Sequence, residues 1–262
     1  MSIAVVGGGA MGSALVSGWL AAGHDPTDIL VVEPDQHRAA ELADRLKVRV
    51  AAPGEQVNAD VVVLAVKPQQ VIGVLTELSH TLPRSSLVVS IAAGVTLSAL
   101  TAALPEDQPV FRVMPNTPAL VGKGMSGLVA GPGTTPAQLE IVKGLLGAVG
   151  KVLVIGEEQI DALTAMSGSG PAYVFLVAEA MIEAGVHQGL TREQSTLLTN
   201  QTFVGAAEML ATSERGASEL RERVTSPAGT TAAALRVLED RGVRAAFLAA
   251  VEASARRSAH LQ

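Results

Sequence analysis

A glycine turn between a short apolar run and a helical stretch is the feature that most constrains how this chain can fold. The run Ile3–Val6 is followed at once by Gly7, Gly8, Gly9, Ala10, Met11 and Gly12. The spacing Gly-x-Gly-x-x-Gly after a strand and at the start of a helix is typical of a dinucleotide-binding βαβ unit. Gly7 would permit the tight turn, Gly9 the close approach of a pyrophosphate, and Gly12 close packing of the helix on the strand. The sequence therefore predicts a dinucleotide site at this turn.

Short β-branched runs alternate with helical stretches up to about residue 156. The expected strands are Ile3–Val6, Ile29–Val32, Val48–Val50, Val61–Ala65, Leu87–Ile91, Val110–Val113, Leu128–Ala130 and Val152–Ile155. The expected helices are Ala10–Ala22, Gln36–Leu46, Gln69–Leu78, Leu97–Leu104 and Ala137–Leu146. Near-continuous apolar strands separated by helices indicate a parallel sheet that is covered on both faces. We expect a Rossmann-type doubly wound α/β domain over residues 1–156.

The strand signal ends after Gly156, and only helical stretches follow. They are Ile160–Met166, Ala172–Glu183, Arg192–Thr212, Ala217–Val224, Thr231–Asp240 and Val243–Arg256. We therefore expect an all-α domain over residues 157–262. The helix Ala172–Glu183 carries charge only at Glu179 and Glu183, and a helical half of this size cannot bury such a surface alone. This predicts a homodimer, or a larger assembly of dimers, joined through the C-terminal helices.

Composition argues against several other classes of protein. The net charge is −6 and aromatic residues make up 2% of the chain, so nucleic acid is not an expected partner. The chain has no cysteine and its five histidines are scattered, so no metal site is predicted. The uncharged stretch Ala162–Ala178 is short and broken by Gly168, Gly170 and Pro171, which argues against a membrane span. With no signal-peptide pattern, we expect a soluble cytoplasmic protein without a membrane partner.

The end of the second expected strand carries an acid that bears on cofactor choice. Glu33 lies where a Rossmann domain places the carboxylate that accepts a hydrogen bond from the adenosine ribose. Such a carboxylate repels a 2′-phosphate, which favours NADH over NADPH. Two alternatives stay open: Glu33 is a solvated loop acid, or the nearby Arg38 meets a phosphate.

Three further segments follow strand ends, where open α/β sheets bind their ligands. Ala65, Val66, Lys67 and Pro68 follow the fourth strand, and Ala93 follows the fifth. Lys67 is either a ligand to a cofactor hydroxyl or phosphate or an ordinary surface lysine.

The motif Met114-Pro115-Asn116-Thr117-Pro118 follows the sixth strand in the same way. Asn116 is a candidate for the nicotinamide side of the cofactor pocket. The alternative is that the two prolines simply make a rigid connection.

A second anion site is predicted near the other end of the chain. The turn Thr225-Ser226-Pro227-Ala228-Gly229-Thr230-Thr231 leads directly into an alanine-rich helical run. The first amides of a helix lack intrahelical partners, and the helix dipole adds positive charge there, so such a turn suits an anion. The alternative is that its hydroxyls only cap the helix.

Taken in order, the motifs resemble one family. The glycine turn, Ala-Val-Lys-Pro, Ala-Ala-Gly, Met-Pro-Asn-Thr-Pro, Ser-Gly-Ser-Gly-Pro-Ala-Tyr and Thr-Ser-Pro-Ala-Gly-Thr-Thr are similar to those of pyrroline-5-carboxylate reductases, from residue 3 to about residue 257. The resemblance implies NAD(P)H-dependent reduction of 1-pyrroline-5-carboxylate to L-proline, the last step of proline biosynthesis. It also implies an N-terminal Rossmann domain and a C-terminal helical dimerisation domain.

The resemblance also assigns site residues. Val6 to Met11, Glu33, Ala65 to Pro68 and Ala93 fall where the family contacts the dinucleotide. Glu214, Thr230 and Thr231 fall where the family contacts substrate or product, with Ser226 beside them. Two residues depart from the family pattern: Ala228 stands where many members have a glycine, and Glu33 stands where NADPH-using members have small polar or basic residues. If position 228 needs a positive φ, alanine there costs about 1 kcal/mol or more.

The expected chemistry is hydride transfer to the imine carbon of a small ring that carries one carboxylate. Backbone amides of Gly229 to Thr231 would hold the carboxylate, and we expect Thr231 and Ser226 to act at the reacting centre. The proton donor stays open between the Thr231 hydroxyl and a bound water, and a six-membered cyclic imine stays open as an additional substrate.

Two other functions remain as alternatives. A β-hydroxyacid dehydrogenase would need a lysine in a Gly-x-Gly-x-x-x-Lys helix, but Val174 holds that position and no lysine follows Lys151. A non-catalytic dinucleotide sensor would keep the glycine turn and would not need the turn of Ser226 to Thr231.

Overall fold

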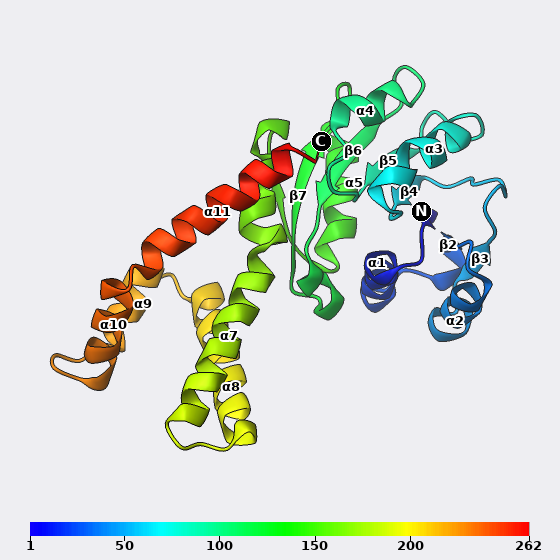
Figure 1. Cartoon of the computed structure of the whole chain (residues 1–262). Coiled ribbons are helices and arrows are strands. Elements are labelled where there is room, and N and C mark those ends of the chain that lie inside the picture. The colour runs from blue at the N-terminus through cyan, green and yellow to red at the C-terminus, as the bar shows by residue number, and fades with distance from the viewer. Residues whose placement is uncertain (262) are drawn as a thin grey trace. The chain divides into compact units, whose positions relative to one another are not determined.

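The computed structural model describes residues 1–261 and divides the chain into two compact units (Figure 1). The first unit is Met1–Ser169 together with the described residues from Ser254 onward, and the second is Gly170–Ala253. The division falls later than residue 156 because the segment after β8 packs on the first unit, where Leu163 lies against Gly127. These units are defined by contacts within the structure, so the predicted boundary between folding domains at residue 156 stays a prediction.

The first unit contains one eight-stranded sheet. Its strands are β1 Ile3–Val6, β2 Ile29–Val32, β3 Arg49–Ala51, β4 Val61–Leu64, β5 Leu87–Ser90, β6 Val110–Met114, β7 Gly124–Ala130 and β8 Gly150–Val154. They lie in the order β3-β2-β1-β4-β5-β6-β7-β8, and Val5 of β1 pairs with Val31 on one side and Val63 on the other. The chain thus turns from one half of the sheet to the other between β1 and β4, the topological switch point of a Rossmann fold.

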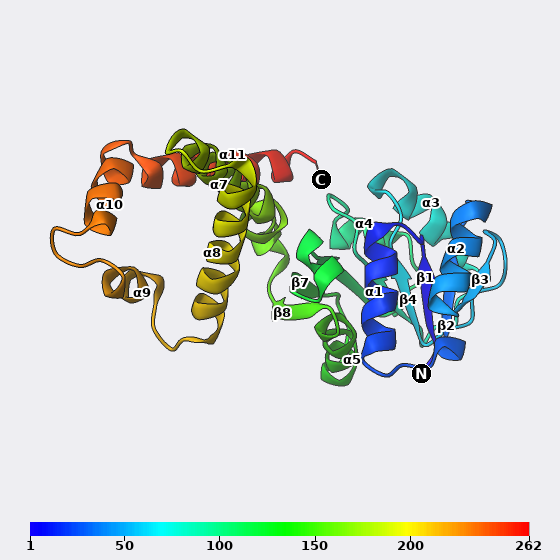
Figure 2. The ribbon, with the colours of Figure 1, turned by 90° about the horizontal axis from the view of Figure 1, so that it is seen from below.

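Helices cover both faces of this sheet, as the sequence predicts (Figure 2). The helices are α1 Ala10–Ala21, α2 Gln36–Leu46, α3 Pro68–Ser79, α4 Leu97–Ala102 and α5 Pro136–Gly147. Alternate strand residues point to opposite faces. Ile3 and Val5 of β1 pack with α1 and α5, whereas Ala4 and Val6 pack in the layer that contains α3 and α4. The doubly wound α/β domain is confirmed.

One strand direction differs from the expected all-parallel sheet. β7 runs antiparallel to β6, while β7 and β8 are parallel to each other. The connection from β6 to β7 contains only the short 3-10 helix Thr117–Val121, and a parallel return would need a crossover of a dozen or more residues. β7 also begins at Gly124, four residues before the predicted start at Leu128.

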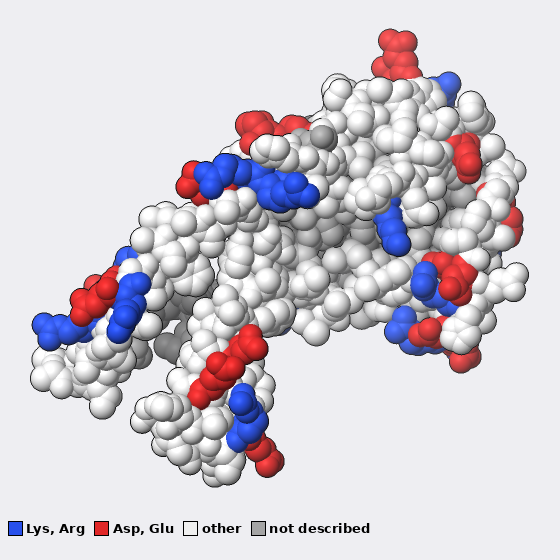
Figure 3. All heavy atoms as spheres, in the orientation of Figure 1, with Lys and Arg blue, Asp and Glu red and all other residues white. Residues whose placement is uncertain are grey.

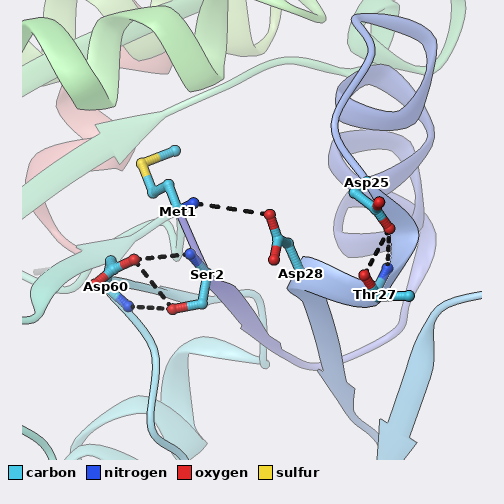
Figure 4. A network of polar contacts seen from close by, with 6 residues as sticks. All are labelled: Met1, Ser2, Asp25, Thr27, Asp28 and Asp60. Carbon is cyan, nitrogen blue, oxygen red and sulfur yellow. Dashed lines mark hydrogen bonds and ion pairs between the residues drawn. The ribbon is translucent and has the colours of Figure 1, made fainter.

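Polar contacts fix the amino ends of the first strands (Figure 4). The Ser2 amide donates to Asp60 Oδ2 (2.8 Å) and the Asp60 amide donates to Ser2 Oγ (3.0 Å), which ties the start of β1 to the start of β4. Asp25 begins the short 3-10 helix Pro26–Asp28 by accepting from the Thr27 hydroxyl (2.6 Å) and amide (2.8 Å). These bonds hold the pKa of the Asp25 carboxyl below its usual range, with the hydroxyl as the larger cause. The network lies at the edge of the sheet opposite to the glycine turn.

The second unit is helical and lacks a core of its own. Helices α7 Gly170–His187, α8 Arg192–Thr212, α9 Ala217–Arg223 and α10 Thr230–Asp240 lie in it, and α11 Val243–Ala259 leads out of it. Between residues 170 and 253 no apolar side chain is buried, and the side chains of Phe175, Leu176 and Leu197 are 67%, 65% and 70% exposed. A helical unit of this kind needs a partner surface to bury its apolar faces.

The expectation that Gly168, Gly170 and Pro171 break the stretch Ala162–Ala178 is wrong. The chain stays helical from Glu157 to His187, through a π turn at Thr164–Gly168, and by length and hydropathy this stretch could cross a membrane. Gly170 and Pro171 do not break it because they lie in the first turn of α7, where proline is tolerated. Length and composition alone are weak grounds for a membrane span, since an apolar helix that packs against a partner passes the same test. On the face shown in Figure 3, charged side chains form small mixed groups between broad uncharged areas, which include much of this helical unit.

Candidate functional site

The glycine turn lies at the carboxyl end of β1, at the switch point of the sheet. Gly7 has φ +108°, and a Cβ there would stand 2.6 Å from the Ala65 carbonyl oxygen. A Cβ on Gly12 would stand 2.1 Å from the Gly7 carbonyl oxygen. Both positions therefore require glycine, Gly7 for its backbone conformation and the close passage of β4, and Gly12 for packing of α1 on the turn.

Gly9 differs from these two glycines because its surroundings are open. A Cβ added to Gly9 would meet no atom of the chain within 4 Å. Gly9 is the N-cap of α1 without a side-chain cap, and the first helical bond runs from the Ser13 amide to the Gly9 carbonyl (2.9 Å). The amides of Ala10, Met11 and Gly12 therefore lack intrahelical acceptors and are suited to an anion. These residues fit the pyrophosphate of a dinucleotide.

Glu33 is buried and bonded to the glycine turn. Its Oε2 accepts from the Gly8 amide (2.9 Å), and its Oε1 accepts from the Asp35 amide (2.9 Å) and from Arg38 Nη1 (3.2 Å). The interpretation of Glu33 as a solvated loop acid is therefore wrong. The carboxylate reaches the turn as the ribose-binding hypothesis requires, and it has the Arg38 guanidinium beside it.

Asp35 fixes the start of the helix that carries Arg38. Its carboxylate accepts from the Arg38 amide (3.0 Å) as the N-cap of α2, and this bond holds the pKa of Asp35 below its usual range. The Arg38 side chain is about half exposed, so its guanidinium is reachable from solvent beside the Glu33 carboxylate. A cation and an anion thus stand together where the ribose of a dinucleotide is expected.

Two other predicted segments lie along the same edge of the sheet. Ala65 follows β4, where its amide donates to the Val6 carbonyl (2.8 Å), and α3 begins with Pro68 after the N-cap Lys67. Lys67 and Ala93 are exposed, and Val66 is partly buried. The structure thus brings the segments after β1, β4 and β5 to one edge, while direct contact of each residue with a cofactor stays a prediction.

Asn116 uses both ends of its side-chain amide inside the protein. Its Oδ1 accepts from the Met125 amide (2.8 Å), and its Nδ2 donates to the Ser167 carbonyl (2.9 Å). The predicted contact with the nicotinamide side of a cofactor stays a prediction. In the structure its polar atoms are engaged by β7 and by the π turn.

The second predicted anion site is one continuous turn in the helical unit. The Gly229 amide donates to the Ser226 carbonyl (3.1 Å), and α10 begins at Thr230 with Gly229 as an N-cap that has no side-chain cap. Within residues 1–261 the hydroxyls of Thr230 and Thr231 make no hydrogen bond, so the interpretation of these hydroxyls as helix caps is wrong. The first intrahelical bond is made by the Ala233 amide (3.1 Å), which leaves the three preceding amides for an anion.

Gly229 packs closely against Ser226. A Cβ on Gly229 would stand 2.4 Å from Ser226 Oγ, so the serine hydroxyl occupies the space that a side chain would need. Ser226, Gly229, Thr230 and Thr231 are therefore brought together in one turn. Glu214 lies in the loop between α8 and α9, and among the described residues it makes no hydrogen bond or ion pair with this turn.

Ala228 has a φ of +57°, so this position does adopt the left-handed conformation that would favour glycine. The bond across Ser226 and Gly229, with Pro227 second and a positive φ third, is the pattern of a type II turn, in which the third position prefers glycine. Alanine in this region is disfavoured by roughly 1–2 kcal/mol, partly offset by the entropy that glycine loses on folding.

We expect Ala228→Gly to raise the free energy of unfolding by about 0.5–1 kcal/mol. Urea denaturation would measure the change. Lys47→Gly is a matched control, because Lys47 has the same φ of +57° at the end of α2 and lies outside both predicted sites. Equal stabilisation by both variants is the expected result, and destabilisation by Ala228→Gly would contradict it.

A buried ion pair was not predicted. Arg112 in β6 is buried and pairs with Glu157, whose Oε1 also accepts from the Leu97 amide (2.9 Å) at the start of α4. The pair joins the segment after β8 to the sheet and to α4. An arginine inside an otherwise apolar strand is the sequence signal that could have revealed it, since buried charges are paired.

Comparison with known proteins agrees with this architecture. Residues 157–261 match the family described as pyrroline-5-carboxylate reductase dimerisation, and residues 2–94 match the family described as NADP oxidoreductase, coenzyme F420-dependent. The pyrroline-5-carboxylate reductase of Corynebacterium melassecola is 49% identical over 234 residues, which cover 87% of each chain.

Solved structures give the same result. The pyrroline-5-carboxylate reductase of Coxiella burnetii superposes with a TM-score of 0.95 at 39% identity, covering 100% of this chain and 98% of the other. The Plasmodium falciparum pyrroline carboxylate reductase, solved with NADP bound, superposes with a TM-score of 0.85 at 30% identity over 100% and 98% of the two chains. On these similarities, the chain belongs to the pyrroline-5-carboxylate reductase family.

Proposed function

We propose that this protein reduces 1-pyrroline-5-carboxylate to L-proline with NAD(P)H, as the last step of proline biosynthesis. Family membership makes it an NAD(P)H-dependent oxidoreductase, and the cyclic imine substrate is the finer part of the proposal. The observation that carries it is an uncapped turn of Ser226 to Thr231 in the same chain as a glycine turn at a Rossmann switch point. One turn suits a pyrophosphate and the other suits a small carboxylate.

The glycine turn would bind and orient the cofactor. The amides of Ala10 and Met11 are available to the pyrophosphate, and the Ser13 hydroxyl donates to the Gly8 carbonyl (2.9 Å), which fixes the turn. Bound nicotinamide supplies the hydride in this reaction. The protein's largest contribution is then to hold the imine carbon in a near-attack position.

The second turn would hold the substrate carboxylate. Amides of Thr230, Thr231 and Ala232 lack intrahelical acceptors, and the dipole of α10 adds positive charge at this end. The ring nitrogen must gain a proton as the imine becomes an amine. We assign the orientation of that nitrogen to the Thr231 hydroxyl, with Ser226 beside it, and the proton comes either from this hydroxyl or from a water that it holds.

The test is an assay of NADH and NADPH oxidation, followed separately with five- and six-membered cyclic imino acids. Turnover of the five-membered imine, with proline as the product, is the expected result. Activity on a β-hydroxyacid instead would favour the dehydrogenase alternative, which the absence of lysine after Lys151 argues against. Cofactor binding without turnover of any imine would favour a sensor. A cytoplasmic location, without a membrane partner, stays a prediction.

The bond between Glu33 and the glycine turn supports a preference for NADH. A carboxylate at this position disfavours a 2′-phosphate, and we expect kcat/KM to be higher with NADH than with NADPH. Arg38 is the residue that can still meet a phosphate, so Arg38→Ala should lower kcat/KM for NADPH about threefold or more, while that for NADH stays within about twofold. A clear NADPH preference in the unaltered protein would overturn this prediction.

Assembly follows from the missing core of the helical unit. The family match over residues 157–261 supports a homo-oligomer, and the exposed apolar faces of α7 and α8 are the surfaces that a second copy would bury. We expect equilibrium sedimentation at micromolar concentration to give a dimer or a multiple of dimers. A monomer that keeps its full helix content by circular dichroism would contradict this prediction.

A further inference from the structure

A π turn ends the helical segment of the first unit. Over Thr164–Gly168 the helix widens by one residue, and the Ser169 amide donates to the Thr164 carbonyl (2.8 Å), five residues back. The Ser167 hydroxyl donates to the Leu163 carbonyl (3.0 Å). Such turns are rare, tend to occur at functional sites, and leave backbone groups that need partners from elsewhere in the fold.

Asn116 supplies that partner. The Met125 amide can only donate, so it fixes the carboxamide with Oδ1 toward β7 and Nδ2 toward the Ser167 carbonyl (2.9 Å). The side chain therefore ties the sheet to the π turn across 51 positions of sequence.

The chain passes between the two units twice, and the first-unit end of each passage lies beside this π turn. The chain enters the second unit after Ser169 and returns at Ser254, and the hydroxyls of these two serines lie 2.9 Å apart. One turn further along α11, the Ser258 hydroxyl donates to Asp161 Oδ1 (2.6 Å). The two ends of the helical unit are thus held together on the first unit, next to the π turn that Asn116 fixes.

We propose that Asn116 is a positioning residue, which acts on the substrate turn through the π turn and does not bind the cofactor. The turn of Ser226 to Thr231 belongs to the second unit, which the chain enters after Ser169 and leaves at Ser254. The inference rests on the proposed function, since it assigns the substrate to that turn. A substitution of Asn116 should therefore change kcat and the KM for the imino acid. It should leave the affinity for the cofactor unchanged.

The test is Asn116→Asp. Aspartate has nearly the same shape and still accepts from the Met125 amide, but its carboxylate cannot donate to the Ser167 carbonyl. We expect kcat/KM for the five-membered imino acid to fall about tenfold or more through both kcat and KM, with the cofactor Kd from NADH fluorescence within about twofold. Hydrogen exchange of the Ser169 amide should accelerate in the same variant.

The pH profile separates positioning from general damage. A protonated carboxyl at position 116 can donate again, so the activity of Asn116→Asp relative to the unaltered protein should rise as the pH falls toward about 5. Asn58→Asp is the matched control, because this variant makes the same change of charge. Asn58 is exposed and makes no hydrogen bond among the described residues. Its activity should be unchanged at every pH.

Two results would overturn the inference. A tenfold rise in the cofactor Kd with an unchanged imino acid KM would make Asn116 a cofactor ligand, and unchanged kinetics would make it inert. Should Asn116→Asp fail to fold, Ser254→Ala removes the neighbouring contact to Ser169, and the same split between imino acid and cofactor is required of it. If the unaltered protein does not turn over the imine, the proposed function fails, and exchange of the Ser169 amide still tests whether Asn116 holds the π turn.

Discussion

Alanine at position 9 is expected to weaken dinucleotide binding about 30-fold and to leave the free energy of unfolding unchanged. The stability should not change because a Cβ on Gly9 meets no atom of the chain within 4 Å, and its φ of −65° and ψ of −172° suit alanine. The affinity should fall because the methyl group would stand where the pyrophosphate approaches the backbone. A hydrogen bond to a charged group is worth about 2 kcal/mol, which corresponds to about 30-fold in Kd.

Gly12→Ala is the comparison variant, because it should lower the stability of the fold, whereas Gly9→Ala should not. Its Cβ would stand 2.1 Å from the Gly7 carbonyl oxygen, so the helix must shift, at a cost of about 1–3 kcal/mol of stability. Cofactor titration by fluorescence and urea denaturation of both variants are the measurements. If Gly9→Ala binds the cofactor as tightly as the unaltered protein, the pyrophosphate does not approach this glycine and the predicted cofactor site is wrong.

Thr231→Ala is expected to lower kcat/KM for the imino acid by about 10- to 100-fold, with no loss of stability. The Thr231 hydroxyl makes no hydrogen bond within residues 1–261, and α10 has Gly229 as its N-cap without a side-chain cap. Its removal therefore takes nothing from the fold, and alanine favours the helix slightly. Because the hydroxyl makes no contact within the described chain, a loss of activity would indicate that it contacts the substrate.

Thr231→Ser is the matched control, because serine retains the hydroxyl at the same point of the helix. It should keep activity within about threefold of the unaltered protein, since only a methyl group is lost. Steady-state kinetics at saturating cofactor distinguish the variants. Unchanged kcat/KM in Thr231→Ala would remove the hydroxyl from the mechanism and leave the backbone amides as the only contribution of this turn.

Much of the site was readable from the sequence because it depends on local geometry. Glycine at positions 7 and 12 reports a left-handed turn and a close helix contact, and the structure shows both. The family resemblance drew attention to Ala228, which stands where many members have a glycine, and the structure shows that its φ is positive. Such features follow from the conformational limits of single residues, which hold whatever the rest of the chain does.

The parts that the sequence did not reveal involve residues far apart along the chain. Glu33 is bonded to Gly8, 25 positions away, and Arg112 pairs with Glu157 across 45 positions. Asn116 was interpreted as a cofactor residue because it follows a strand, and only the fold shows that both of its polar ends are bonded to the protein. The periodic pattern of apolar residues in a sequence does not indicate which polar groups contact one another in the folded chain.

By itself, the sequence predicted the order of strands and helices, the glycine turn after β1 and the turn of Ser226 to Thr231 before α10, because apolar period and glycine chemistry act within a few residues. Only the structure showed that this second turn has no side-chain cap. The tertiary structure alone decided that β7 runs antiparallel to β6, that the chain returns to the first unit at Ser254, and that residues 170–253 bury no apolar side chain within one chain. These properties depend on the length of connections and on surfaces that meet only after folding. The exposed apolar side chains of residues 170–253 are the surface that the expected second subunit would bury.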